Sequence, residues 1–134
     1  MILIDTSALI EFLNHTRSPF DKEIEHLISN DEDMAFADIT ITETLQGIKD
    51  DKEFREIKNS LAAFPVYSLK GIDSYIAAVE IYRKCRKKGL TIRSTTDLLI
   101  AQAALENNLI LMHNDNDFQS IAKISNLKTY KLRS

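Results

Sequence analysis

The sequence has little cysteine, proline and glycine, with one Cys, two Pro and three Gly among 134 residues. The single thiol, Cys85, cannot form an internal disulfide, which excludes a disulfide-stapled scaffold and favours a reducing compartment. With 44% hydrophobic residues, the chain is neither collagen-like nor disordered in composition. No apolar run approaches the roughly 20 residues of a membrane helix, and the first residues carry no basic, cleavable leader. We therefore expect a cytoplasmic protein with no membrane segment, folded as a single domain over residues 1–134.

The chain also lacks a strong excess of one charge, because its net charge is −3. Two long segments of the chain differ in charge, however. Residues 21–57 hold 12 acidic and 4 basic residues, whereas residues 58–134 hold 6 acidic and 12 basic ones. Much of the positive charge lies in the run 83–88, which Arg93 follows. Such a run is either a solvated helix end, where cations complement the helix dipole, or a surface that contacts nucleic-acid phosphates.

Short apolar runs alternate with segments of helical periodicity along the chain. The runs predict strands at 2–4, 34–37, 66–69 and 109–112, with a weaker edge strand over 127–132. The helical spacing predicts helices over 7–14, 20–29, 42–63 with a break near residue 50, 73–88, and two more that begin near residues 94 and 118. Strands separated by helices favour an α/β fold with a parallel sheet.

Four acidic residues fall beyond the carboxyl ends of the predicted strands, where open α/β sheets bind their ligands. Asp5 ends the first strand, and Asp115 follows the last core strand. Glu43 is expected at the start of the helix after the second strand. Asp97 is expected in the first turn of the helix before the last core strand. These four side chains should therefore meet at one edge of the sheet.

Each acid also has an ordinary structural explanation. Glu43 and Asp97 each stand three residues after a Thr or Ser, as in capping boxes, while Asp5 suits a helix cap and Asp115 a turn. The coincidence of all four is harder to explain, because two carboxylates about 5 Å apart repel by about 3 kcal/mol at an effective dielectric constant of about 20. A cluster of acids needs protons or a cation, and Mg²⁺ and Mn²⁺ prefer all-oxygen surroundings. The pattern therefore predicts a metal site.

Four motifs resemble the PIN-domain nucleases, above all the toxin subunits of VapBC-type toxin–antitoxin modules. They are Ile4-Asp5-Thr6-Ser7-Ala8-Leu9-Ile10, Glu43-x-x-x-Gly47, Thr91-Ile92-Arg93-Ser94-Thr95-Thr96-Asp97-x-x-Ile100-Ala101 and Asp115-x-Asp117-Phe118. The resemblance spans nearly the whole chain and implies a three-layer α/β/α PIN-like fold around a central parallel sheet. It implies a metal-dependent endoribonuclease that hydrolyses RNA phosphodiester bonds with Mg²⁺ or Mn²⁺. It also implies the role of toxin, a cognate antitoxin partner and a homodimer.

The resemblance extends to individual residues. It implies that Asp5, Glu43, Asp97 and Asp115 are the catalytic and metal-binding acids, with Asp117 as a further metal-site acid and Thr6 or Ser7 supporting the pocket. We expect Asp5 to be the central ligand, because it lies on the innermost strand, and the ion to activate a water for attack on phosphorus. The predicted RNA-binding residues are Arg93, Arg86 and Lys87, since Lys and Arg supply phosphate contacts.

His113 departs from the family pattern, which often has Thr or Ser two positions before the fourth acid. Its ring either packs against neighbours or faces solvent, or it borders the pocket, where it would contact RNA phosphate or bind a softer metal. Two alternatives concern function. The chain could be an inactive PIN-like module that binds RNA or a partner protein, which a metal titration would test. The acidic segment 20–57 either covers the sheet or offers Phe20, Leu45 or Phe54 to a partner helix.

Overall fold

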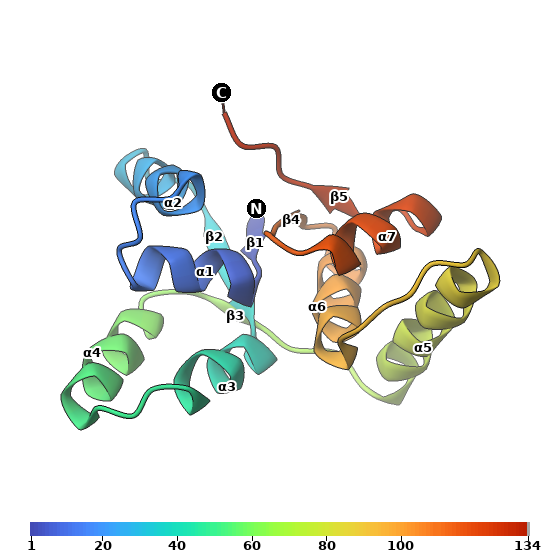
Figure 1. Ribbon diagram of the computed structural model, residues 1–134, viewed down its shortest axis with the longest axis horizontal. Helices are drawn as coiled ribbons and strands as arrows, with labels where there is room; N and C mark the ends of the chain where they lie inside the picture. Colours follow the sequence, from blue (N-terminus) through green and yellow to red (C-terminus); the bar gives the residue numbers. More distant parts are fainter. Residues whose placement is uncertain (134) are drawn as a thin grey trace.

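A parallel sheet of five short strands forms the centre of the molecule (Figure 1). The structure is a computed structural model and describes residues 1–133. The strand order is β3-β2-β1-β4-β5, and every pairing is parallel. The central strand β1 lies between β2 and β4. The strand order therefore reverses at β1, and open α/β sheets bind their ligands at the carboxyl end of such a strand. The strands are β1 (Ile2–Ile4), β2 (Met34–Ala37), β3 (Val66–Tyr67), β4 (Ile110–Met112) and β5 (Lys128–Thr129).

Helices cover both faces of the sheet. Alternate strand residues point to opposite faces, so Leu3 packs in one hydrophobic cluster and Ile4 in the other. The Ile4 cluster holds α1, α2 and α4, and the Leu3 cluster holds α5, α6 and α7. The expected three-layer α/β/α architecture is confirmed. The helices are α1 (Thr6–Leu13), α2 (Pro19–Ser29), α3 (Asp38–Gln46), α4 (Asp51–Leu61), α5 (Ile72–Lys87), α6 (Thr95–Glu106) and α7 (Asn116–Ile124).

The segment after β2 differs from the sequence-based expectation. Helix α3 begins at Asp38, directly after the strand, with Ala37 as its N-cap. Glu43 therefore lies in the middle of this helix, and the expectation that it starts the helix was wrong. Isoleucine and threonine fill the first turns of α3 and have low helix propensity, which hid the true start. The expected break near residue 50 is real, because Asp50 caps a separate helix, α4.

The edge strands are also shorter than expected. Strand β3 has two residues where four were expected, and β5 has two within the expected segment 127–132. Each of them pairs with a neighbouring strand on one side only. Fewer backbone hydrogen bonds therefore hold its residues in the extended conformation. Within residues 1–133, no helix has both the length and the hydropathy required to cross a bilayer.

Candidate active site

Asp5 stands at the carboxyl end of β1, beside the end of β4. Its backbone N–H donates to the carbonyl of Met112 at 2.9 Å, which holds the two strand ends together. Its carboxylate Oδ2 caps α1 by accepting from the backbone N–H of Ser7 at 3.0 Å. The Ser7 hydroxyl donates to the same oxygen and accepts from the backbone N–H of Asn114 at 2.9 Å. Ser7 thus fixes one oxygen of Asp5 and ties α1 to the segment after β4.

The Glu43 side chain is held by a hydroxyl group. The Thr6 hydroxyl donates to its Oε1 at 2.7 Å, and the hydroxyl oxygens of Thr6 and Thr40 lie 3.1 Å apart. Because Thr6 has a single hydroxyl proton, Thr40 supplies the proton of the second bond. Thr40 is fully buried in the first turn of α3, so it does not form the capping box with Glu43 that its spacing suggested. Sequence analysis missed Thr40 as a supporting residue, although its position three residues before Glu43 places both on one helix face.

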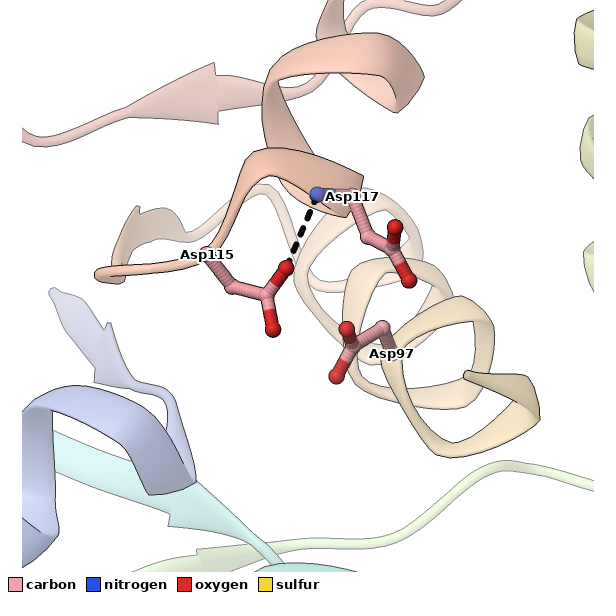
Figure 2. A group of neighbouring side chains, drawn as sticks. All are labelled: Asp97, Asp115 and Asp117. Carbon is pink, nitrogen blue, oxygen red and sulfur yellow. Dashed lines mark hydrogen bonds between the residues drawn. The ribbon is translucent and has the colours of Figure 1, made fainter. Parts of the chain in front are cut away.

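Three carboxylates gather on the other side of β1 (Figure 2). Asp97 comes from the first turn of α6, and Asp115 and Asp117 from the start of α7. One oxygen of each lies within 4.8 Å of the others. Asp115 is exposed and caps α7 by accepting from the backbone N–H of Asp117 at 2.9 Å. Asp117 is buried and accepts from the backbone N–H groups of Arg93 and Ser94 at 2.9 and 3.0 Å.

The carboxylate of Asp97 is not used for helix capping. Ser94 caps α6 and accepts from the backbone N–H of Asp97 at 3.4 Å, as one half of a capping box requires. The other half is missing, because the Ser94 N–H donates to Asp117 instead. Among the described residues, Asp97 Oδ2 is buried and has no hydrogen-bond partner. A buried carboxylate oxygen without a partner is costly, so Asp97 suits a bound ligand better than a structural role.

The acids act on one another through their charges. Burial raises the pKa of Asp97 from its ordinary value of 3.8 to about 8, and the negative charges of Asp5, Asp115 and Asp117 add to the shift. Burial also raises the pKa of Asp5 to about 6, against the hydrogen bonds from Ser7, and Glu43 adds repulsion. Asp5 therefore connects Glu43 electrostatically to the three aspartates. Asp97, Asp115 and Asp117 form the group whose oxygens lie within 4.8 Å of one another, and the expectation that Asp5 is the central ligand stays a prediction.

A comparison with known families agrees with this arrangement, since the profile of the PIN domain matches residues 2–124. The chain belongs to the PIN-domain family. It is 34% identical over 134 residues to VapC ribonuclease Mb1587 of Mycobacterium bovis, covering 99% of this chain and 100% of the relative. Ribonuclease VapC11 of Mycobacterium tuberculosis matches with the same identity and coverage. The resemblance to VapC toxin subunits is thus confirmed.

Solved structures of PIN proteins share the fold. The complex VapBC2 from Rickettsia felis, bound to a DNA fragment from its promoter, contains a chain with a TM-score of 0.75 and 21% identity. The match covers 97% of this chain and 98% of that one. VapBC-1 from nontypeable Haemophilus influenzae gives a TM-score of 0.72 and 23% identity, with 98% of both chains covered. At these identities the likeness concerns the fold alone.

His113 packs beside the acidic site of this PIN domain. Its half-buried ring lies 5.1 Å from the ring of Phe118, centroid to centroid. Its Nδ1 accepts from the backbone N–H of Asp115 at 3.3 Å, and burial lowers its pKa. These contacts make His113 a support for the start of α7, in line with the packing alternative.

The predicted RNA-binding cations lie in two different places. The backbone N–H of Arg93 donates to Asp117, and the Arg93 side chain is exposed. Arg86 and Lys87 are exposed on the last turn of α5. Figure 1 shows this end of α5 far from the first turn of α6, where Asp97 lies. The structure therefore brings Arg93 to the acids, but leaves Arg86 and Lys87 at the opposite end of their helix.

Proposed function

We propose that this protein is a metal-dependent endoribonuclease that hydrolyses RNA phosphodiester bonds and acts as the toxin of a toxin–antitoxin pair. The observation that carries the proposal is the buried Asp97 oxygen without a hydrogen-bond partner, set among Asp115, Asp117 and Asp5. The relationship to proteins named as VapC ribonucleases supports RNA as the substrate class. Action on cellular RNA implies a cytoplasmic location, and the single PIN domain over residues 1–134 would be the whole catalytic unit.

The donor set fits a hard divalent cation. Two oxygens on opposite sides of Mg²⁺ stand about 4.2 Å apart, and one oxygen each from Asp97, Asp115 and Asp117 already lies within 4.8 Å of the others. Asp5 would complete the set through Oδ1, because its hydrogen bonds from Ser7 all go to Oδ2. Glu43 would contribute directly or through water. A bound Mg²⁺ or Mn²⁺ would polarise a phosphoryl oxygen and lower the pKa of a coordinated water.

The chain itself supplies the orientation of these oxygens. Ser7 holds Asp5, two backbone N–H groups hold Asp117, and Thr6 holds Glu43, so the carboxylates do not reorganise when a ligand arrives. The raised pKa means that Asp97 keeps its proton near neutral pH until a cation displaces it. The exposed Arg93 side chain would then contact RNA phosphate.

The test is cleavage of single-stranded RNA by the purified protein with Mg²⁺, Mn²⁺ or EDTA. We expect Asp5→Asn and Asp97→Asn to fold and to lose cleavage by about 100-fold or more, as for lost ligands and their supports. Glu32→Gln, an exposed acid outside the site, serves as the matched control and should keep its rate. Undiminished cleavage by a folded Asp5→Asn protein would overturn the assignment. Metal binding without RNA cleavage would instead identify an inactive binding module.

A cognate antitoxin is proposed as the protein partner. Solved neighbours of this fold include VapBC assemblies from several bacteria, which supports a partner for this chain. We expect the product of a gene beside this one to co-purify with the protein and to inhibit RNA cleavage in a stoichiometric complex. Failure of every adjacent product to bind would remove the toxin role and leave the nuclease intact. We also propose a homodimer.

A further inference from the structure

A cleft of about 320 Å³ lies near the starts of helices α3, α5 and α6. Figure 1 shows these three helix starts at the same edge of the sheet. Thr42, which lines the cleft, directly precedes Glu43 on α3, and Leu99, another lining residue, follows Asp97 by two residues on α6. The cleft is therefore built from the same two helices that carry Glu43 and Asp97, although none of the candidate-site acids lines it.

The lining of the cleft combines apolar side chains, one aromatic ring and one charge. The apolar side chains belong to Ala37, Ile39, Leu69, Leu99 and Ala103. Tyr75, near the start of α5, is 51% exposed and supplies the aromatic ring. Asp38, the first residue of α3, is exposed and supplies the charge. This lining suits a flat ring system with hydrogen-bond donors at its edge, whereas the negative charge of Asp38 repels a phosphate group.

The carboxylate of Asp38 has room for further hydrogen bonds. Its Oδ1 accepts from the backbone N–H of Ile39 at 2.7 Å. This bond uses one of about four lone pairs of the carboxylate, which leaves capacity for two parallel hydrogen bonds from a ligand. Guanine carries two neighbouring donors, N1–H and N2–H, on its Watson–Crick edge, and one carboxylate accepts both. Adenine, cytosine and uracil each place an acceptor beside their donor there, which a carboxylate repels.

We propose that this cleft binds a guanine base of the RNA substrate, in a nucleotide close to the phosphate that is cleaved. The inference rests on the proposed function, because RNA is the ligand that would bring a base and a phosphate to neighbouring places. Tyr75 stacks on the base, and Asp38 accepts from its N1–H and N2–H. Sequence-specific recognition of single-stranded RNA uses these two kinds of contact, stacking on an aromatic ring and hydrogen bonds to the Watson–Crick edge. The cleft thus selects where the acids cut.

The first experiment measures the base preference and needs neither a metal ion nor nuclease activity. The probes are the 5′-monophosphates of guanosine, inosine and adenosine, titrated in EDTA into the isotope-labelled protein and followed by NMR. The guanosine and inosine nucleotides differ only in the N2 amino group. We expect shifts of the amide signals around the cleft and a dissociation constant about tenfold lower for the guanosine nucleotide than for the other two, since each lacks part of the bidentate contact. Equal dissociation constants would overturn the inference.

Two pairs of variants assign the preference to individual side chains. Asp38→Asn should bind the guanosine and inosine nucleotides equally, because an amide has one acceptor oxygen. Asp51→Asn is the matched control, an exposed aspartate at the first residue of α4, and should keep the preference. Tyr75→Ala should weaken binding about tenfold, and Tyr75→Phe should bind like wild type, because the ring alone provides the stacking. A preference that survives Asp38→Asn, or a Tyr75→Phe protein as weak as Tyr75→Ala, would overturn the assignment.

The second experiment tests whether the base belongs to RNA. Oligouridines with a single guanosine at successive positions are incubated with the protein and Mn²⁺, and the cut sites are mapped. We expect cleavage at a fixed distance from the guanosine, about tenfold faster than with inosine at the same position. Cleavage that ignores the guanosine would overturn the inference and leave the proposed function intact. A guanine preference in the titration without cleavage of any RNA would refute the proposed function, and the cleft would then be a site for free guanine nucleotides.

Discussion

Asp97→Asn should stabilise the metal-free protein near neutral pH, although it removes a residue of the candidate site. The substitution keeps the shape of the side chain and leaves it neutral at every pH, in the folded and the unfolded state. Asp97 is 7% exposed, and its Oδ2 accepts no hydrogen bond from the described residues, so little favourable contact is lost. What disappears is the cost of keeping Asp97 protonated near neutral pH, which burial and the negative charges of Asp5, Asp115 and Asp117 impose on the folded protein. Sites that collect like charge for a ligand destabilise the empty fold.

The size and sign follow from the pKa of Asp97, which folding raises from 3.8 to about 8. The folded protein holds this proton more tightly than the unfolded chain, so unfolding releases it between these two pH values, and stability falls as the pH rises. Each pH unit costs up to about 1.4 kcal/mol, which sets an upper limit of about 4 kcal/mol at pH 7. Because the neighbouring acids also titrate, we expect Asp97→Asn to recover about 2 kcal/mol.

Urea unfolding in EDTA, followed by circular dichroism between pH 5 and 8.5, measures this effect. Wild type and the control Glu32→Gln should lose stability across the range, while Asp97→Asn should depend less on pH and be more stable than wild type at pH 7.5. Excess Mn²⁺ should reverse the order, because an ion at 100 times its dissociation constant adds about 2.7 kcal/mol to the protein that binds it. A variant less stable than wild type at pH 7.5 in EDTA would refute the reasoning.

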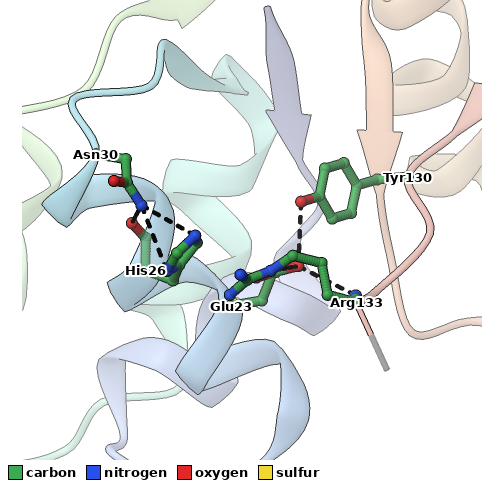
Figure 3. Close-up of polar contacts among 5 residues, drawn as sticks. All are labelled: Glu23, His26, Asn30, Tyr130 and Arg133. Atoms are coloured by element: carbon green, nitrogen blue, oxygen red, sulfur yellow. Dashed lines mark hydrogen bonds and ion pairs between the residues drawn. The ribbon is translucent and has the colours of Figure 1, made fainter.

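Three further substitutions probe the surroundings of the site and the carboxyl-terminal segment. Ser7→Ala removes the hydroxyl that joins Asp5 to the Asn114 backbone. It should lower the free energy of unfolding in urea by about 1 kcal/mol. It should also raise the pKa of Asp5 further, as measured by NMR titration of the carboxyl group; an unchanged pKa would contradict this. His113→Phe should keep the packing against Phe118 within about 1 kcal/mol and leave calorimetric Mn²⁺ affinity unchanged, whereas a tenfold loss would make His113 a ligand. Arg133→Ala removes the guanidinium that donates to the buried Glu23 at 2.8 Å (Figure 3). The substitution should lower the free energy of unfolding by about 1–2 kcal/mol at pH 7. The loss should be smaller in acid, because the contacts with Arg133 lower the pKa of Glu23 and stabilise the fold only while Glu23 is ionised. A loss that grows in acid would contradict the pairing.

The fold and the location of the site could be predicted because both follow from short-range patterns. Apolar runs between amphipathic helices specify a parallel sheet. The carboxyl ends of parallel strands share one edge, so Asp5 and Asp115 had to approach each other. Which hydrogen bonds each carboxylate oxygen accepts could not be predicted from the sequence. The Ser94 N–H binds Asp117 and leaves Asp97 unsatisfied, a choice that depends on the tertiary position of α7.

The position of Arg86 and Lys87 was misleading in the sequence, where they stand only a few residues before Arg93. Helix α5 returns from the carboxyl edge of the sheet, so its last turn lies at the opposite edge, and the segment 88–94 then crosses back to the start of α6. Proximity along the chain therefore did not give proximity in space. Topology decides which end of a helix faces the site.

The strand order has a consequence for how the site is assembled. Strands β1, β2 and β3 come from residues 1–67 and form one side of the sheet, while β4 and β5 come from residues 110–129 and form the other. Asp5 and Glu43 belong to the first part of the chain, and the three aspartates Asp97, Asp115 and Asp117 belong to the second. A cut in the connection between Tyr67 and Ile72 would give two fragments, one with Asp5 and Glu43 and the other with the three aspartates. Nuclease activity of such a split chain would report directly on whether its two fragments have found each other.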